Sequence, residues 1–428
     1  MTLPNKPRGA QDIYPPRSLL FQKIQQIITE ILRKNNYQPL IFPTFETQEL
    51  FTLSLGAATD IIHKEMYTFS DRKGRQLALR PEGTASVARL VCQNNLIKAN
   101  YPLKFYYWAN MFRYERPQAG RHREFWQLGV ELINILGTQA DFQILKLASD
   151  ILTGLGITGF IFNINYLGGK ETKENYKKEL TEFINKNNPQ LCSDCQRRYQ
   201  VNPLRILDCS ICQKISFPAY EKVWNVQSRS YFQALTNLLN RFNFPYQHNS
   251  RLIRGLDYYT GIVFEVNLET KKAILGGGRY DNLYQEIAGC QVSALGFAFG
   301  IERLINYLEN YQVNSPLLKI IPKVDIFFLT SVAEFYPDIL TWKKELHKYP
   351  WTVDYNLEIK NFNKFRKVIR RYQPYLLIIL GIKEWKSSKI VIKDCQKQEE
   401  FQVEKNKVVD WIINYLKELS FGKKKIMF

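Results

Sequence analysis

Residues 104–132 read K-F-Y-Y-W-A-N-M-F-R-Y-E-R-P-Q-A-G-R-H-R-E-F-W-Q-L-G-V-E-L, and this stretch decides the class of fold. Two apolar, aromatic-rich segments, 104–113 and 125–132, flank a turn-rich segment that contains Pro117 and Gly120. Aromatic runs bounded by such residues are typical of strands. Because strands joined by a short connection pair antiparallel, the stretch predicts an antiparallel sheet rather than alternating strands and helices.

The segments around this hairpin extend the same architecture. An amphipathic helix is expected over 15–36, because Leu20, Ile24 and Ile28 recur at helical spacing. Further short strands are expected at 39–46, 66–69, 76–79, 252–266 and 273–275. The glycine-rich G-G-G-R-Y-D at 276–281 and a strand-then-helix pattern at 294–308 close this part of the chain.

Composition then divides the chain into domains. Residues 168–246 are rich in Lys and Asn, mostly helical in pattern and carry paired cysteines, which indicates an insertion. Residues 312–323 form a connector with proline, and beyond it apolar runs alternate with helical patterns, as in a small α/β domain. We therefore expect a core domain over 1–322, interrupted by the insertion, and a second domain over 323–428.

The charge of the chain indicates a polyanionic partner. Fifty-nine Lys and Arg residues against forty acids give a formal net charge of +19, which favours nucleic acid over an anionic membrane surface or a plain solubility bias. No apolar run reaches the ~20 residues that span a bilayer, and we see no secretory or transit leader. The Ile-, Lys- and Asn-rich composition is typical of an AT-rich genome. We expect a soluble protein, in the plastid stroma if organelle-encoded and otherwise in the cytoplasm.

Arginines cluster around the hairpin turn. Arg113 and Glu115 stand two apart, so on a strand they would share a face, either as a structural ion pair or as part of a site. The turn adds further arginines, namely Arg116, Arg121 and Arg123. Guanidinium groups match phosphate oxygens in geometry, and this cluster therefore favours a polyphosphate ligand.

Several motifs occur together and in a characteristic order: P-R-G-A-Q-D-I-Y-P (7–15), R-P-E-G-T (80–84), F-R-Y-E (112–115), R-G-L-D-Y-Y (254–259), G-G-G-R-Y-D (276–281) and G-F-A-F-G-I-E-R-L (296–304). Over nearly the whole chain the sequence resembles the class II aminoacyl-tRNA synthetases, and among them the histidyl-tRNA synthetase family. F-R-x-E and G-x-E-R are shared across class II, whereas R-G-L-D-Y-Y and G-G-G-R-Y-D are typical of the histidine branch. The chain departs from the pattern at Ala10, where threonine is usual, and at Asn282, where glycine is usual.

The resemblance implies a fold and a reaction. The fold is an α+β catalytic core on an antiparallel sheet with a helical insertion, followed by an α/β anticodon-binding domain. The reaction is activation of L-histidine by ATP, with Mg²⁺ bridging the phosphates, and transfer of the histidyl group to histidine tRNA. The resemblance also implies a homodimer with the region around Pro43 in the interface, and no membrane.

Roles for individual residues follow from the resemblance. Arg113 is expected to hold the α-phosphate and Arg254 to lie between the substrate carboxylate and that phosphate, which makes both catalytic. The remaining ATP contacts are expected from Glu115 near the adenine amino group, Arg121 on the γ-phosphate and Arg303 on the polyphosphate or adenine side. For tRNA, Arg116 and Gln118 are placed to meet the acceptor end, and the basic helix at 364–371 faces either the anticodon stem or solvent.

Histidine recognition is expected to use both ring nitrogens, because neutral imidazole offers one donor and one acceptor. Glu131 would accept the ring N–H, and Tyr259 would donate to the other nitrogen. Parity along the expected 252–266 strand puts Asp257 and Tyr259 on one face and Tyr258 on the other, so Tyr258 would line the wall or support its neighbour. The other expected histidine contacts are Glu82, Gly83, Thr84 and Gln127.

The cysteine pairs allow two interpretations. Cys192-x2-Cys195 and Cys209-x2-Cys212 have a spacing close to that of a zinc ribbon. The surrounding segment, however, resembles the family's helical insertion, which we do not associate with obligatory zinc. We therefore predict no metal held by protein side chains and keep a structural zinc as the alternative. Paired thiols in an odd total of seven favour a reducing compartment.

Two rival functions fit part of the pattern. Regulatory relatives from histidine biosynthesis share the catalytic fold, but they usually lack the anticodon-type domain and the substrate residues. A zinc-ribbon nucleic-acid-binding protein would explain the charge and the cysteines, but it leaves F-R-Y-E and R-G-L-D-Y-Y without a purpose.

Overall fold

The computed structural model of the chain describes residues 3–56, 59, 61–99, 101–116, 120–209, 211–268, 273–312, 315–319, 324–356 and 372–424. It forms two compact units. The first contains residues 1–14 and 20–318, and the second contains residues 15–19 and 319–428. The domain boundary expected between 322 and 323 lies outside the described residues.

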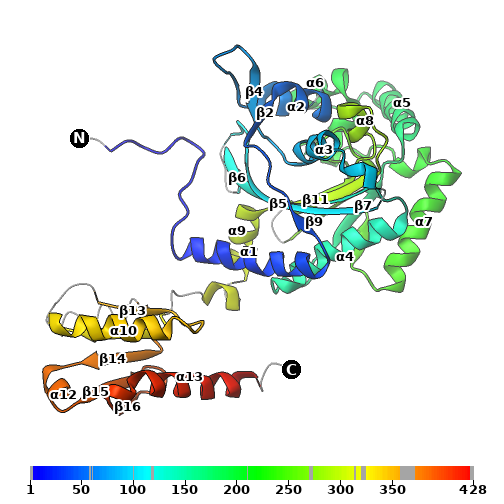
Figure 1. Cartoon of the computed structure of the whole chain (residues 1–428). Helices are drawn as coiled ribbons and strands as arrows, with labels where there is room; N and C mark the ends of the chain where they lie inside the picture. Colours follow the sequence, from blue (N-terminus) through cyan, green and yellow to red (C-terminus); the bar gives the residue numbers. More distant parts are fainter. Residues whose placement is uncertain are drawn as a thin grey trace. The chain divides into compact units, whose positions relative to one another are not determined.

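The first unit is built on a mixed sheet that is mostly antiparallel (Figure 1). Its described strands run, in spatial order, β1 (Gln38–Pro39), β5 (Leu103–Phe112), β6 (Glu124–Ile133), β11 (Ala294–Gly300), β10 (Ala273–Arg279), β9 (Thr260–Asn267), β7 (Phe162–Tyr166) and β8 (Tyr246–His248). Only the outer pairs, β1 with β5 and β7 with β8, are parallel. The hairpin predicted from 104–132 is confirmed, since β5 and β6 pair antiparallel from Leu103↔Ile133 to Phe112↔Glu124.

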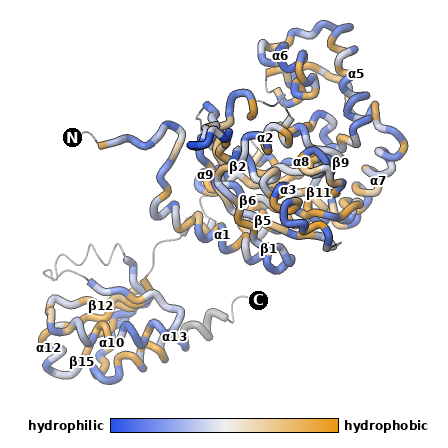
Figure 2. The backbone as a smooth tube through the Cα atoms, turned by 45° about the horizontal axis from the view of Figure 1, so that its top comes forward, coloured by the Kyte–Doolittle hydropathy of each residue, from blue (hydrophilic) through white to orange (hydrophobic). Residues whose placement is uncertain are grey.

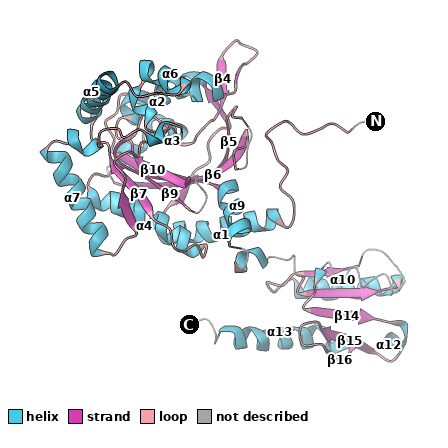
Figure 3. Cartoon of the chain, turned by 180° about the vertical axis from the view of Figure 1, so that it is seen from behind, coloured by secondary structure: helices cyan, strands magenta, loops and turns pink. Residues whose placement is uncertain are grey.

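Helices cover both faces of this sheet. α1 (Arg17–Lys34) and α4 (Thr138–Gly154) lie on one side, and α2 (Gln48–Leu55), α3 (Thr84–Gln93) and α8 (Leu283–Ala288) lie on the other, as the opposite views of Figures 1 and 3 show. α1 buries Leu20, Ile24 and Ile28, the residues at helical spacing in the sequence. The remaining elements of this part are β2 (Phe45–Thr47), β4 (Gln76–Leu79) and β3 (Thr68–Ser70), which form a small antiparallel sheet, with η1 (Ile61–Glu65), η2 (Leu96–Ala99) and α9 (Ile301–Tyr311).

The described residues between β7 and β8 form helices joined by turns and irregular stretches. These helices are α5 (Lys170–Asn187), α6 (Ser193–Val201), η3 (Pro203–Ile206), η4 (Cys212–Lys214), η5 (Tyr220–Val223) and α7 (Val226–Arg241). α5 is polar on its outer side but buries Tyr176, Leu180 and Ile184 at a helical spacing of four residues. Because the Tyr176 and Tyr220 rings stack with their centroids 4.2 Å apart, α5 is fixed to the later part of the same segment.

Two strands expected from the sequence are shorter in the structure. Residues 39–46 do not form one strand, since Arg80 donates to the carbonyl oxygens of Phe42 (2.8 Å) and Pro43 (3.0 Å) and so replaces a strand partner. The strand expected at 252–266 begins only at Thr260. Ahead of it, the Asn165 amide donates to the Leu252 carbonyl (2.9 Å) and Lys173 donates to that of Asp257 (3.2 Å). Side chains therefore satisfy backbone groups that a strand neighbour would otherwise pair.

The second unit is the expected α/β arrangement. Its sheet runs β13 (Val353–Tyr355), β12 (Ile326–Thr330), β14 (Leu376–Leu380), β15 (Lys389–Asp394) and β16 (Glu399–Glu404), parallel among the first three and antiparallel among the last three. Its described helices are η7 (Ala333–Phe335), α10 (Tyr336–Leu346), α12 (Ile382–Lys386), η9 (Lys405–Lys407) and α13 (Val408–Lys424), and η6 (Pro316–Lys319) lies at the boundary between the two units. Figure 2 shows that β12 is hydrophobic. Its residues Ile326 and Phe328 are buried in the core of this unit.

Two further features bear on the sequence predictions. The basic helix expected at 364–371 lies outside the described residues. Among the residues that the structure does describe, no helix combines the length and the apolar character needed to cross a bilayer.

A buried ion pair joins the sheet of the first unit to its helices. Arg279 of β10 contacts Asp141 of α4 at 2.6 Å (Nη2 to Oδ1), and the two side chains are 5% and 0% exposed. The other carboxylate oxygen of Asp141 accepts a hydrogen bond from Tyr231 of α7 at 2.6 Å. Asp141 therefore connects β10, α4 and α7.

We expect Asp141→Ala to lower the free energy of unfolding of the first unit by about 3 kcal/mol, because it removes the closer of the two carboxylates that pair with the buried Arg279 and leaves only Asp281 at 3.3 Å. Chemical denaturation followed by tryptophan fluorescence measures the change. Asp150→Ala, on the same helix, is the matched control, since its pair with Lys146 is exposed and should contribute less than about 1 kcal/mol. Equal effects of the two substitutions would contradict this account of the buried pair.

Candidate active site

A hollow of about 450 Å³ lies on the central sheet where α3 begins, and it collects residues from motifs far apart in the chain. Most residues predicted from the sequence line it: Glu82, Thr84, Arg113, Glu115, Arg121, Gln127, Arg254, Tyr258, Tyr259 and Arg303. Glu131 contacts two lining residues directly, since the hydroxyl groups of Thr84 and Tyr280 both donate to its carboxylate. The structure therefore brings the predicted histidine and ATP residues into one cavity.

Glycines in the sheet make room for this cavity. Gly129 of β6 lies under the ring of Tyr107, and a Cβ at this position would overlap that ring. Gly276 of β10 lies under the guanidinium of Arg254, where a Cβ would come within 2.6 Å of Nη1. Large polar side chains can therefore rest on the backbone of the sheet itself.

Two buried carboxyls belong to the cavity, one in its lining and one in contact with it. Glu131 is 2% exposed and Glu82 is 3% exposed. Burial raises the pKa of Glu131 to about 8, although hydrogen bonds from Tyr280 and Thr84 lower it in part. Burial also raises the pKa of Glu82. The Glu131 carboxyl is consequently protonated over much of the neutral range.

The R-P-E-G-T motif runs into a helix, because Thr84 is the first residue of α3. Glu82 stabilises this helix start. Its two carboxylate oxygens accept the N–H groups of Thr84 (2.7 Å) and Ala85 (2.8 Å), which are unpaired donors at the start of the helix. Gly83 does not line the cavity, and a Cβ there would overlap the ring of Tyr107.

The R-G-L-D-Y-Y segment forms turns, so the parity argument for its side chains was wrong. Tyr258 and Tyr259 both line the cavity, with ring centroids 4.8 Å apart. Asp257 instead pairs with Arg205 of the insertion at 3.2 Å. Arg254 contacts Glu265 at 2.8 Å, and its Nε is buried with no hydrogen-bond partner among the described residues. The buried Oε1 of Gln127 likewise has no described partner.

Three arginines of the cavity lining are Arg113, Arg121 and Arg303. Arg113 donates to the Pro81 carbonyl (2.8 Å), and Arg303 donates to the carbonyls of Gly120 (3.1 Å) and Ala273 (2.8 Å). Burial lowers the pKa of Arg303, and the charges of Arg121 and Arg113 lower it further. Three positive charges that repel one another in a partly buried site favour an anionic ligand.

Arg113 and Glu115 reach the cavity by a different route from the one expected. β5 ends at Phe112, so both residues follow the strand and strand parity does not place them. The Arg113 N–H donates to the Arg123 carbonyl (2.9 Å), and the Glu115 N–H donates to the Arg113 carbonyl (2.7 Å), which turns the chain back over the cavity. Glu115 pairs there with Arg121 at 3.3 Å.

The two residues predicted for the tRNA acceptor end are not in the cavity lining. Arg116 is exposed outside it, and Gln118 lies outside the described residues.

Sequence reasoning missed several cavity residues, among them Tyr107, Asp208, Glu265 and Tyr280. Tyr280 follows directly on the glycines of G-G-G-R-Y-D, so the motif itself carried a signal. Asp208 comes from the insertion, between the cysteine pairs, and nothing in its local pattern indicates a place beside Arg254.

The raised pKa of Glu131 predicts a pH-dependent stability. The stability that its protonated carboxyl provides is complete below about pH 4.5, the ordinary pKa, and is lost as the pH rises to about 8. Glu131→Gln keeps an uncharged side chain at every pH. The difference in urea midpoint, wild type minus Glu131→Gln, should therefore fall between pH 5 and 8 and stay constant above pH 8. A difference that does not change with pH would show that the carboxyl is ionised throughout.

The chain is similar to known proteins over nearly its whole length. A family model described as "Histidyl-tRNA synthetase" matches residues 9–168 and 216–304. Proteins named histidine–tRNA ligase match at 38% identity, in Aquifex aeolicus (92% of this chain and 97% of that protein) and in Bacillus subtilis (93% and 96%).

A solved structure is also similar. The apo histidyl-tRNA synthetase of S. aureus matches with a TM-score of 0.80 at 28% identity, covering 96% of this chain and all of that one. Together with the family match and the two relatives, this shows that the chain belongs to the histidyl-tRNA synthetase family of class II aminoacyl-tRNA synthetases.

Proposed function

We propose that the protein activates L-histidine with ATP, releases pyrophosphate and transfers the histidyl group to the 3′ end of histidine tRNA. The observation that carries this proposal is one cavity that combines two kinds of polar group. Thr84 and Tyr259 line it, with the buried carboxyl of Glu131 accepting from Thr84, and so do the arginines Arg113, Arg121 and Arg303. Such a cavity suits an amino acid with a polar ring next to a polyphosphate.

Activation joins a carboxylate oxygen of histidine to the α-phosphorus of ATP and breaks the bond between that phosphorus and the bridging oxygen, which leaves with pyrophosphate. The electron pair of the broken bond moves to the leaving pyrophosphate. The protein forms no covalent bond in this step, and positioning and charge stabilisation supply the rate. Arg254 is proposed to lie between the carboxylate and the α-phosphate and Arg113 on the α-phosphate.

The other ATP contacts fit the arginines of the cavity lining. Arg121 is proposed for the γ-phosphate, Arg303 for the polyphosphate or adenine side and Glu115 for the adenine amino group. Aminoacyl-tRNA synthetases in general use ATP together with Mg²⁺, and we propose that the Mg²⁺ complex of ATP is the substrate here. The mutual repulsion of the arginines supports this assignment, because an anion between them would relieve it.

Histidine is proposed to lie with its ring between Glu131 and Tyr259. Tyr258 would form the wall, and Glu82, Thr84 and Gln127 would hold the α-ammonium group, with Gly83 joining Glu82 to the start of α3. The unpaired Oε1 of Gln127 supports this orientation, because a buried acceptor without a partner is costly unless a ligand donates to it.

Transfer requires a surface for tRNA. We propose that Arg116 and Gln118 meet the acceptor end and that residues 323–428 bind the anticodon region, with the basic helix at 364–371 facing the anticodon stem. The net charge of +19 supports a polyanionic partner of this kind.

The protein is further proposed to act as a homodimer through the region around Pro43. Ile41 is 93% exposed and Phe45 is 51% exposed, which is unusual for neighbouring large apolar side chains. The composition supports the plastid stroma for an organelle-encoded chain and the cytoplasm otherwise.

Histidine-dependent exchange of labelled pyrophosphate into ATP tests the function. We expect exchange with histidine and about 10⁴-fold less with phenylalanine, which leaves the polar groups of the pocket unpaired. Gly276→Ala should lower the exchange rate by about 10²–10³, the effect of losing one preorganised donor, because it displaces Arg254.

Gly277→Ala is the control that reports a loss of folding stability. Its Cβ would meet the backbone carbonyl of Gly296 and come within 2.6 Å of the Phe297 Cβ, so this substitution should lower the denaturation midpoint. Gly276→Ala should leave the denaturation midpoint close to that of the wild type. No exchange by the folded wild-type protein would contradict the proposed function, and a wild-type rate in Gly276→Ala would contradict the role of Arg254.

Tyr259→Phe tests the recognition of the ring. Without the hydroxyl, one imidazole nitrogen loses its partner, so the KM for histidine should rise about 10-fold while the KM for ATP stays unchanged. The exchange assay measures both constants, and Tyr258→Phe is the neighbouring control with a smaller expected change. An equal rise in both KM values for Tyr259→Phe would show that the hydroxyl serves the whole cavity instead of the ring.

A further inference from the structure

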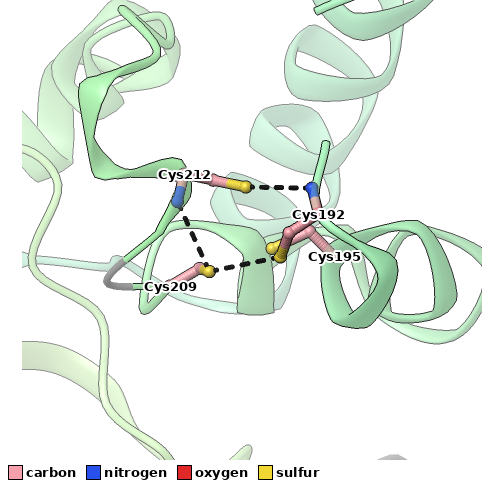
Figure 4. Close-up of side chains that lie close together, drawn as sticks. All are labelled: Cys192, Cys195, Cys209 and Cys212. Carbon is pink, nitrogen blue, oxygen red and sulfur yellow. Dashed lines mark hydrogen bonds between the residues drawn. The ribbon is translucent and has the colours of Figure 1, made fainter. Parts of the chain in front are cut away.

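Four cysteines of the insertion lie together (Figure 4). Cys192 immediately precedes α6, Cys195 lies in its first turn, Cys209 follows η3, and Cys212 begins η4. Their sulfur atoms all lie within 4.8 Å of one another, and the side chains point toward a common centre. Three of the four residues are buried, so this is a closed cluster and not a surface group.

The distances suit a tetrahedral metal ion. Zinc binds cysteine sulfur at about 2.3 Å, which separates two sulfur ligands by about 3.8 Å. The Cys192 and Cys209 sulfur atoms are 3.7 Å apart. A disulfide would instead need a separation of about 2.05 Å, and all seven cysteines of the chain are free thiols.

Backbone groups around the cluster also match a site for thiolates. The Cys192 N–H points at the Cys212 sulfur (3.4 Å), and the Cys212 N–H points at the Cys209 sulfur (3.5 Å). Hydrogen bonds of this kind stabilise the negative charge that sulfur carries when it binds a metal. The two chain turns are therefore shaped around the sulfur atoms.

The donor set selects the kind of metal. Four thiolates, with no carboxylate or histidine among the ligands, favour zinc over hard cations, and a full set of four protein ligands is typical of a structural site. The family match covers residues 9–168 and 216–304 and leaves out all four cysteines, so the general resemblance does not assign this site.

The segment between the pairs reaches the cavity. Arg205 pairs with Asp257 at 3.2 Å, and the Asn202 amide donates to the same carboxylate at 3.2 Å. Asp208, one residue before Cys209, lines the cavity beside Arg254. An ion that fixes the two cysteine turns would therefore also fix Arg205, Asn202 and Asp208, which lie at the R-G-L-D-Y-Y segment.

We propose that Cys192, Cys195, Cys209 and Cys212 bind one structural zinc ion, and that this ion holds residues 196–208 against the R-G-L-D-Y-Y segment. The metal site follows from the cluster alone, whereas its effect on substrate binding rests on the proposed function. In this account Arg205, Asn202 and Asp208 are positioning residues. The structure thus favours the alternative that the sequence left open for the cysteines.

The first experiment measures metal in the purified full-length protein, prepared without chelator. We expect one zinc per chain by elemental analysis, and none in Cys209→Ser or Cys212→Ser. Cys395→Ser, which removes a thiol of the second unit, should keep its zinc. A folded wild-type protein with no bound metal, or an iron–sulfur chromophore in its place, would overturn the proposal.

Cobalt(II) substitution keeps the test decisive where a serine variant does not fold. Wild-type protein stripped by a chelator and titrated with cobalt should develop thiolate-to-metal charge-transfer absorption with an end point of one equivalent, and zinc should bleach it. If the stripped protein is folded and the charge-transfer absorption still does not develop on adding cobalt, the cluster is not a metal site.

The positioning role has its own readout. Loss of the zinc should raise the KM for histidine about 10-fold and leave the KM for ATP within about twofold. Asp257→Asn, which loosens the contact without touching the cysteines, should show the same split with its zinc retained. Unchanged histidine KM in zinc-free protein would overturn the coupling but leave the metal site in place. Absence of exchange in every form would instead count against the proposed function.

Discussion

The site depends on one constraint: large polar side chains must lie directly on the backbone of a sheet. Gly129 and Gly276 leave the space that Tyr107 and Arg254 occupy. With side chains at those two positions, neither the guanidinium nor the ring could reach its place. Because the strands are antiparallel and the β5–β6 hairpin is long, the same surface also receives the arginines that follow β5. The architecture of the fold and the shape of the cavity therefore have a common origin.

The cavity combines two kinds of polar group. Glu131 and Glu82 are removed from water, which raises their pKa values. Arg113 and Arg303 donate to backbone carbonyl groups, which carry no net charge, so the charge of these two arginines remains available to a ligand. This contrast is what an amino acid and a polyphosphate require when they react at one point.

The sequence was sufficient for the main architecture and for candidate residues that mostly lie in one cavity, and the failures have physical causes. Alternating aromatic and apolar residues predicted the hairpin from Lys104 to Leu132 almost to the residue, because periodicity and turn residues agree there. Residues 252–259 look like a strand in isolation, but side chains from β7 and α5 take up their carbonyl groups. The parity assignment of Tyr258 and Tyr259 failed for that reason. Asp208 could not be found, because its place depends on how the insertion folds back on the core.

The insertion links the periphery of the molecule to its centre. The sequence suggested Asp257 for the cavity face. Asp257 instead pairs with Arg205 of the insertion. In the zinc proposal, the ion bound by the cysteine cluster fixes the position of Arg205. A segment outside the general family match thereby contributes to the most specific motif of the site.

The central claim is that this cavity binds histidine and ATP in a fixed relative orientation. A crystal structure of the protein with L-histidine and a non-hydrolysable ATP analogue tests it most directly. The account predicts the imidazole nitrogens within hydrogen-bond distance of Glu131 and Tyr259, the carboxylate on Arg254, and the phosphates among Arg113, Arg121 and Arg303. An imidazole ring bound away from Glu131, or phosphates outside the arginine cluster, would contradict it.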